Sequence, residues 1–173
     1  MNSKTLVSHI ENNELKNKRK NNVKESFTWN EFINITHHLI SNINYGGKEY
    51  KYIYPVPRGG LIPGVILSYN YNLPLLLTEQ DMLSKPLIDI LIVDDIVDSG
   101  NTLLKYFERG YDIASVFVRH TTIFTPKYYG HQINHSNWIM LPYDNPDIED
   151  TISKVKEKNG GEGGPGGIIY KNK

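Results

Sequence analysis

The sequence contains no cysteine, which excludes disulfide bonds, thiolate catalysis and cysteine-ligated zinc sites. It also lacks an excess of either charge: 19 Lys and Arg residues face 19 Asp and Glu residues, so no net positive field attracts nucleic acid or an anionic membrane. No apolar run approaches the ~20 residues of a membrane-spanning helix, and the amino terminus lacks the apolar core of a signal peptide. We therefore expect a cytoplasmic protein that binds neither nucleic acid nor membrane.

The length of 173 residues suits one domain with a substantial core. Residues 1–25 are polar and nearly devoid of core-forming side chains, and we expect them to form an N-terminal extension. Its basic cluster, residues 16–20, favours a solvated face over a nucleic-acid contact. The domain itself is expected over residues 26–158, with a final helix capped by Asn145. The glycine-rich residues 159–173 are predicted to be a flexible tail.

The strongest signal lies in residues 90–104, where an apolar run leads into acidic and then small residues. The run predicts a strand buried on both faces of a parallel sheet, with Asp94 and Asp95 at its carboxyl end. Residues 99–102 then open a helix whose free backbone N–H groups and dipole favour a phosphate. Two carboxylates beside a phosphate would repel it unless they bind another part of the ligand. They can accept hydrogen bonds from ribose hydroxyls or ligate a divalent cation. We therefore predict a sugar phosphate with Mg²⁺; for an Asp-Asp pair alone, acids that merely solvate a loop are the alternative.

A second loop of the same kind follows the strand expected at residues 50–54. Gly59 and Gly60 allow backbone N–H groups to approach an anion, and Arg58 offers a planar, charged fork for phosphate oxygens. A ligand with phosphate groups at both ends needs two such loops on one sheet edge. A dinucleotide-binding site is excluded because no Gly-x-Gly-x-x-Gly or Walker motif follows either strand. A generic Gly-Gly turn before a helix is the alternative for this loop.

Other local patterns complete the α/β prediction. Thr28 and Glu31 form the pattern of a capping box, which predicts that a helix begins there. Short strands are expected at residues 75–77 and 114–118. The histidines of the second half of the chain lack metal-ligand spacing and are assigned to loops: His120, His131 and His135.

Residues 90–102 resemble the phosphoribosyl-pyrophosphate (PRPP) signature of the type I phosphoribosyltransferases. That signature is an apolar strand, an acidic pair, two apolar residues, then Asp, Ser or Thr, Gly, any residue and Thr. The other segments that match, in order, are Thr28 with Trp29, residues 57–64 and residues 137–144. Over roughly residues 27–144, the order of elements resembles the xanthine-guanine branch of the family.

This resemblance implies an α/β fold in which helices flank a mostly parallel sheet and a small C-terminal hood lies beside it. The implied activity is transfer of the phosphoribosyl group of PRPP to a 6-oxopurine base (guanine, xanthine or hypoxanthine), with release of pyrophosphate. Mg²⁺ is the implied cofactor, and a homodimer or homotetramer is the implied assembly. The resemblance also implies a cis peptide bond just before Arg58.

The resemblance gives each matching residue a role. The expected substrate-binding residues are Asp94, Asp95, Ser99, Gly100, Asn101, Thr102, Gly59, Gly60, Arg119, Trp138 and Ile139. Asp98 is expected to exchange a proton with a purine nitrogen, and Arg58 to stabilise departing pyrophosphate. Asp95 and Asp144 are the expected metal ligands.

Three of these binding roles concern the base. Trp138 would stack on it, although Trp138 taken alone is more typical of a core residue. The backbone of Ile139 would meet the Watson-Crick edge. Arg119 stands where the family has a lysine that donates to the 6-oxo group. A planar guanidinium with several N–H donors thus replaces one ammonium, which leaves the choice of base open.

The chain departs from the family at residues 78–86, which are short where the family carries a long mobile loop over the reacting centre. A PRPP- or nucleotide-binding regulatory protein with weak or lost catalysis is therefore an alternative on the same fold. A pyrimidine acceptor such as orotate is a weaker alternative, because the segment around Trp138 matches the purine branch.

Overall fold

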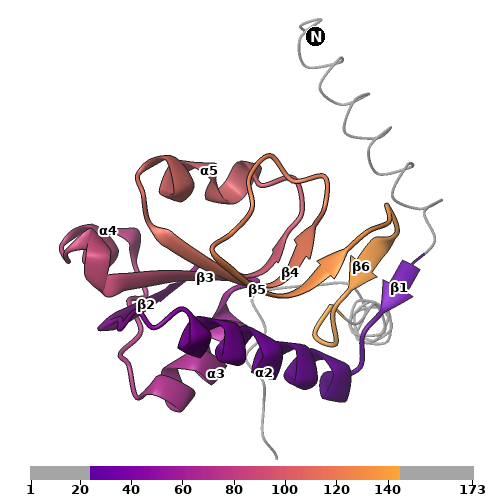
Figure 1. The fold of residues 1–173 in the computed structure, drawn as a ribbon, viewed down its shortest axis with the longest axis horizontal. Helices are drawn as coiled ribbons and strands as arrows, with labels where there is room; N and C mark the ends of the chain where they lie inside the picture. Colours follow the sequence, from indigo (N-terminus) through magenta and orange to yellow (C-terminus); the bar gives the residue numbers. More distant parts are fainter. Residues whose placement is uncertain (1–23, 145–173) are drawn as a thin grey trace, which may run out of the picture.

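The computed structural model describes residues 24–144. The expected helix after Asn145, the glycine-rich tail and residues 1–23 of the expected extension lie outside this range. The helices and strands in chain order (Figure 1) are β1 (Lys24–Ser26), α2 (Trp29–Tyr45), β2 (Tyr52–Pro55), α3 (Leu61–Tyr71), α4 (Glu79–Leu83), β3 (Ile90–Val97), α5 (Asn101–Glu108), β4 (Asp112–Arg119), β5 (Tyr128–Ile133) and β6 (Trp138–Met140). Within this range no helix has the length and apolar character needed to cross a membrane.

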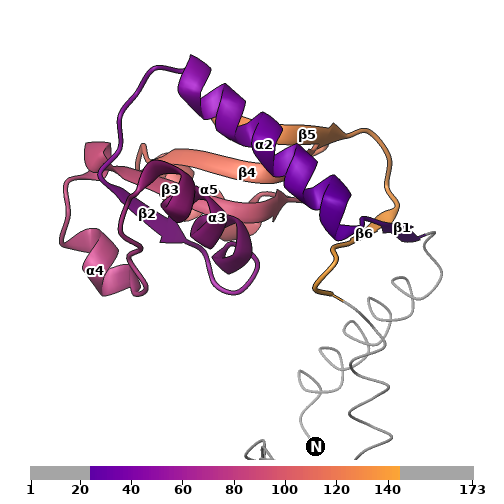
Figure 2. The same ribbon diagram turned by 90° about the horizontal axis from the view of Figure 1, so that it is seen from below.

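The main sheet has four parallel strands in the order β2-β3-β4-β5. Helices α2 and α3 cover one face and α5 covers the other, as Figures 1 and 2 show. The side chains of β3 alternate between the two cores: Leu91 and Val93 pack with α2 and α3, whereas Ile90 and Ile92 pack with α5. All four are at most 1% exposed, which confirms the strand predicted to be buried on both faces.

Helix α2 begins at the predicted capping box. The Glu31 backbone N–H donates to Thr28 Oγ1 (3.3 Å), and the Thr28 backbone N–H donates to Glu31 Oε2 (2.8 Å). The Thr28 backbone N–H and, at 2.7 Å, the Thr28 hydroxyl both donate to Glu31 Oε2, which lowers the pKa of Glu31. The helix then buries Phe32 and Leu39 completely against the sheet, which fixes the register of its apolar face.

A second, two-stranded parallel sheet joins β1 to β6 and forms the expected hood. At the centre of this small sheet, Glu25 pairs with Ile139. Figure 1 shows the hood beyond the ends of β4 and β5. Lys24 and Glu25, which the sequence placed in the extension, therefore belong to a strand. Phe27, which directly follows β1, anchors the hood, because the centre of its ring lies 4.7 Å from that of Phe117.

Two predictions of local structure were wrong. Residues 75–77 form no strand; Leu75 makes only an isolated bridge to Ile53. The pairing of β2 with residues 75–77 stops after Ile53. Pro55, the next residue of β2 on the same side, has no N–H to donate. His131 lies in β5, opposite Phe117, and not in a loop. That strand mixes polar and apolar residues without alternation, so its sequence gave no strand signal.

Candidate active site

The end of β3 and the loop after it form a small hollow at the carboxyl edge of the sheet. Asp94, Asp98, Ser99, Gly100 and Thr102 line most of it. Gly100 opens α5 with a φ of 91°, a conformation that favours glycine, and a Cβ there would lie 2.7 Å from Thr122 Oγ1. The exposed residues 99, 101 and 102 thus surround the amino terminus of α5, as expected for an anion site.

The second loop lies beside the first. The Val56 backbone N–H donates to the Val93 carbonyl (2.8 Å), and the Pro57–Arg58 peptide bond is cis, as expected. A Cβ on Gly60 would overlap the Val93 carbonyl oxygen, so only glycine fits between β3 and the start of α3. Arg58 is exposed, and its guanidinium is therefore accessible to a ligand.

Gly59 is the point at which the two loops meet. A Cβ at Gly59 would overlap both carboxylate oxygens of Asp95, which means that the carboxylate lies directly against the Gly59 backbone. The sequence predicted two anion loops on one sheet edge, and the structure brings them together with the acidic pair between them. One ligand can therefore contact both loops and both carboxylates.

The two carboxylates differ in their surroundings. Burial, together with the neighbouring Asp95 charge, raises the pKa of Asp94 to about 8. Burial also raises the pKa of Asp95, although hydrogen bonds from the Tyr143 hydroxyl (2.8 Å) and the Ile96 backbone N–H (2.7 Å) oppose that rise. Asp94 is thus protonated near neutral pH, and it can both donate to and accept from a hydroxyl of a ligand.

Arg119 connects the loop after β3 with the hood. Its Nε donates to Asp98 Oδ1, its Nη1 donates to the His135 carbonyl, and its Nη2 donates to the Asn137 carbonyl (3.2 Å). The Arg119 side chain is 11% exposed, whereas that of Asp98 is 53% exposed. The structure thus brings the expected base-recognition residue and the expected acid-base residue into one ion pair.

No protein-family model matches the sequence. Solved structures do match the fold. A xanthine-guanine-hypoxanthine phosphoribosyltransferase from Helicobacter pylori superposes with a TM-score of 0.60 at 18% identity, over 75% of this chain and 99% of the other. A purine phosphoribosyltransferase from Pyrococcus horikoshii superposes with a TM-score of 0.55 at 27% identity, over 70% and 95%. This chain has the type I phosphoribosyltransferase fold.

A third solved structure also matches the fold of this chain. It is a hypothetical protein from Neisseria gonorrhoeae with bound ppGpp, which superposes with a TM-score of 0.58 at 18% identity, over 80% of this chain and 98% of the other. At such low identity the likeness concerns the fold, and the chemistry of this chain has to be argued from its own residues.

In this phosphoribosyltransferase fold, β6 places the expected base-binding residues on the hood. Trp138 is 39% exposed, which argues against a simple core residue, whereas Ile139 is only 6% exposed. Glu25 on β1 holds the loop that precedes β6, because its Oε2 lies 2.6 Å from His135 Nε2. The loop before β6 is therefore tied both to β1 and, through Arg119, to β4.

Sequence reasoning missed Tyr143. Its hydroxyl donates to Asp95, and its ring packs 5.7 Å from Phe32, so it links α2 to the acidic pair. Burial and the Asp95 charge raise the pKa of Tyr143, which keeps the hydroxyl a donor. The only sequence signal was its place beside Asp144, whose own Oδ2 accepts from the Leu141 backbone N–H (3.2 Å).

The expected departure at residues 78–86 takes the form of a short ordered segment. Thr78 caps α4 by accepting from the Asp81 backbone N–H (3.0 Å), and Met82 is fully buried. A capped helix with a buried anchor replaces the long loop expected from the family, and it lies beside the β2 edge of the sheet in Figure 1.

Proposed function

We propose that this chain is a purine phosphoribosyltransferase that transfers the phosphoribosyl group of PRPP to a 6-oxopurine and releases pyrophosphate. In this reaction the bond between the anomeric carbon and the pyrophosphate oxygen breaks, and a bond to a purine ring nitrogen forms. The observation that supports the proposal most is the contact of Gly59 with Asp95, because it places two anion loops around one acidic pair. PRPP has a diol between two phosphate-bearing ends, which suits that arrangement.

Each group of the site has a proposed task in the transfer. The loop at residues 99–102 binds the 5′-phosphate, and Arg58 with Gly59 binds the pyrophosphate. Asp94 and Asp95 hold the ribose hydroxyls. Asp95, whose ionised form is favoured by hydrogen bonds from Tyr143 and the Ile96 backbone, favours the positive charge that develops on the sugar ring. Asp98 accepts the proton of the attacking purine nitrogen, and its exposed carboxylate leaves room for the base.

The carboxylates also fit Mg²⁺, which prefers oxygen ligands and usually takes one or two carboxylates together with substrate phosphates. Asp95 and Asp144 are the proposed ligands; their charges interact, since Asp144 contributes to the raised pKa of Asp95. Bound there, Mg²⁺ would neutralise charge on the leaving pyrophosphate. Within residues 24–144 no group of three or more His, Asp or Glu side chains could hold a metal alone, so the substrate would supply the remaining ligands.

Release of pyrophosphate from PRPP tests the proposal. The assay compares guanine, xanthine and hypoxanthine with adenine and orotate, each with and without Mg²⁺. Turnover with a 6-oxopurine that depends on Mg²⁺ supports the proposal, and its loss in Asp98→Ala supports the role of Asp98. Full turnover in Asp98→Ala removes that role, and turnover with orotate alone would overturn the purine assignment.

A second candidate is a nucleotide-binding regulatory protein without turnover. Two observations favour it: a structure of the same fold contains ppGpp, and the ordered α4 replaces a long catalytic loop. Calorimetry with PRPP, GMP and ppGpp distinguishes the candidates. Saturable binding of these ligands, with no pyrophosphate release on any base, favours the regulatory protein.

A further inference from the structure

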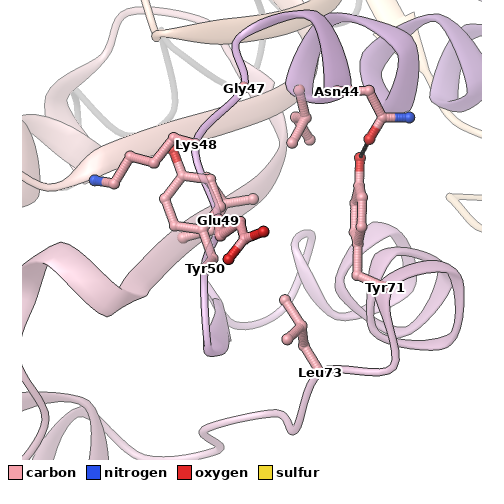
Figure 3. A pocket seen from close by; sticks show the side chains of 9 residues that line it. Asn44, Gly47, Lys48, Glu49, Tyr50, Tyr71 and Leu73 are labelled. Atoms are coloured by element: carbon pink, nitrogen blue, oxygen red, sulfur yellow. Dashed lines mark hydrogen bonds between the residues drawn. The ribbon is translucent and has the colours of Figure 1, made fainter.

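A second cavity, of about 440 Å³, lies at the opposite edge of the sheet from the candidate active site. It is formed where α2 and α3 end and where β2 and β3 begin, and Figure 3 shows it from close by. Leu91 in its floor precedes Asp94 by three residues along β3, so the strand runs from this cavity to the acidic pair. The size lies within the ~300–1,000 Å³ that small-molecule sites occupy.

Hydrogen bonds fix both aromatic walls of the cavity. The Tyr50 hydroxyl donates to Asp112 Oδ2 (2.8 Å) and lies 3.2 Å from the Tyr128 hydroxyl. The Tyr71 hydroxyl lies 2.9 Å from Asn44 Oδ1 and 3.1 Å from the Ile40 carbonyl. Because each phenol is held at its tip, the rings stay apart and the space between them is preformed.

The floor between these walls is apolar. Ile43 is 3% exposed and Leu91 is 1% exposed, and the partly buried Leu73 closes the side nearest α3. A ligand with an aliphatic or aromatic body would therefore lose water-exposed apolar surface on binding.

The charge that faces the cavity is negative. The Glu49 carboxylate points into the space between the rings of Tyr50 and Tyr71, and among the described residues it has no ion-pair partner. Lys48, the other charged residue of the lining, pairs with Asp112 (Nζ to Oδ2, 2.6 Å), a carboxylate that it shares with Lys127. In Figure 3 its ammonium points away from the cavity. An anion is therefore disfavoured here, in contrast to the loops at the other edge.

We propose that this cavity binds a small organic cation, an ammonium or guanidinium group on an apolar body. The positive group pairs with Glu49 and lies near the face of Tyr71, which attracts cations. The Tyr50 ring serves as a wall, because Lys48 Nζ already lies 4.9 Å from its centroid. The body contacts the apolar floor formed by Ile43 and Leu91. This site is independent of the proposed transferase activity, since neither its residues nor its ligand class is shared with the active site.

Three probes of similar shape test the proposal: 2-phenylethylammonium, the neutral 2-phenylethanol and the anionic 3-phenylpropanoate. Amide chemical shifts of the full chain report binding, and the amides of Gly47 and Leu73 report on this cavity. We expect the cation to saturate these shifts and to bind ~3- to 10-fold more tightly than the neutral alcohol, as one partly exposed ion pair with aromatic neighbours allows. The anion should bind most weakly.

Substitutions separate charge from shape. Glu49→Gln should weaken the cation ~3- to 10-fold and leave the alcohol unchanged, because it removes only the charge. The control Glu108→Gln, at an exposed position at the end of α5, should change neither. Tyr71→Leu should weaken both probes, because it removes one wall. Equal binding of cation and alcohol, unchanged cation binding in Glu49→Gln, or shifts confined to residues 94–102 would each overturn the proposal.

Discussion

Arg119 and Asp98 form an ion pair across the mouth of the candidate active site, and the same guanidinium binds two carbonyl groups of the hood. All three of its nitrogen atoms are engaged, so Arg119 connects the proposed acid-base residue with the segment that presents Trp138. The family resemblance gave Arg119 the task of contacting the base. The geometry supports a positioning task in addition, because these hydrogen bonds hold the loop that leads into Trp138.

Arg119→Lys should therefore separate base binding from PRPP binding. A compact ammonium cannot reproduce the planar guanidinium that reaches three acceptors on two segments, and each hydrogen bond to a charged group contributes ~1.5–3 kcal/mol. We expect kcat/KM for the base to fall about 10- to 100-fold, while calorimetry shows PRPP affinity close to that of the unsubstituted protein. Arg109→Lys, at the exposed end of α5, is the matched control and should change neither quantity. Unchanged kcat/KM in Arg119→Lys would contradict the positioning role.

The raised pKa of Asp94 predicts how stability depends on pH. Because its pKa is about 8 in the folded protein and ~3.9 in the unfolded chain, the folded state holds an extra proton between these values. Its stabilising contribution is complete below the unfolded pKa and is lost as the pH rises through about 8.

Asp94→Asn should remove that dependence, because an amide does not titrate. In urea unfolding at alkaline pH, we expect the variant to be more stable than the parent by about 2 kcal/mol, since the parent then buries a charge beside Asp95. The difference should shrink toward acidic pH. The variant should also bind PRPP more weakly, if Asp94 holds the ribose. A variant less stable than the parent at alkaline pH would show that Asp94 is ionised without penalty.

Gly59→Ala should damage the site more than the fold. The added methyl group overlaps both carboxylate oxygens of Asp95, so the carboxylate must move away from the loop. We expect at least ~10-fold weaker PRPP binding, equivalent to ~1.4 kcal/mol, measured by calorimetry. Gly110→Ala is the matched control: its φ of 82° makes alanine cost ~1 kcal/mol of stability there, but nothing lies near its Cβ. PRPP affinity lost equally in both variants would mean that the effect comes from stability alone.

Much of this fold could be predicted because its signals are local. The apolar run of β3 and the capping box at Thr28 depend on residues close together in the sequence, and both were confirmed. Strand β1 was missed because only Glu25 of its three residues is even partly buried, so the strand has almost no apolar pattern. Its identity comes from the ladder with β6, more than 100 residues later in the chain.

The candidate site likewise has a part that local sequence motifs predict and a part that only long-range contacts create. The two anion loops follow from short motifs, and the structure brings both to one sheet edge. The Tyr143 contact with Asp95 spans 48 residues, and the Arg119 bonds reach 21 residues back to Asp98 and 18 forward to Asn137. No spacing rule predicts such pairs, because they depend on how the hood packs against the sheet.

A last prediction concerns the amino edge of the sheet, where one carboxylate joins three segments. Asp112 Oδ2 accepts from Lys48 Nζ (2.6 Å), Tyr50 Oη (2.8 Å) and Lys127 Nζ (2.8 Å). Burial alone would raise the pKa of Asp112, but the hydrogen bonds from Lys127, Lys48 and Tyr50 lower it below its usual range. A lowered pKa contributes stability above the unfolded pKa of ~3.9, and this stability is lost as the pH falls through the folded value.

Asp112→Asn should therefore destabilise the protein by about 1–2 kcal/mol at neutral pH, because an amide oxygen accepts more weakly and leaves Lys48 without its counter-ion. Urea unfolding should show the difference between parent and variant shrinking below about pH 4, where the parent carboxylate is protonated in the unfolded chain and then in the folded protein. Asp89→Asn is the matched control. Its partner Lys51 is 70% exposed, and such surface pairs contribute ~0–1 kcal/mol. A difference at Asp112 that persisted unchanged at acidic pH would mean that the shape of the side chain, and not its charge, holds the three segments together.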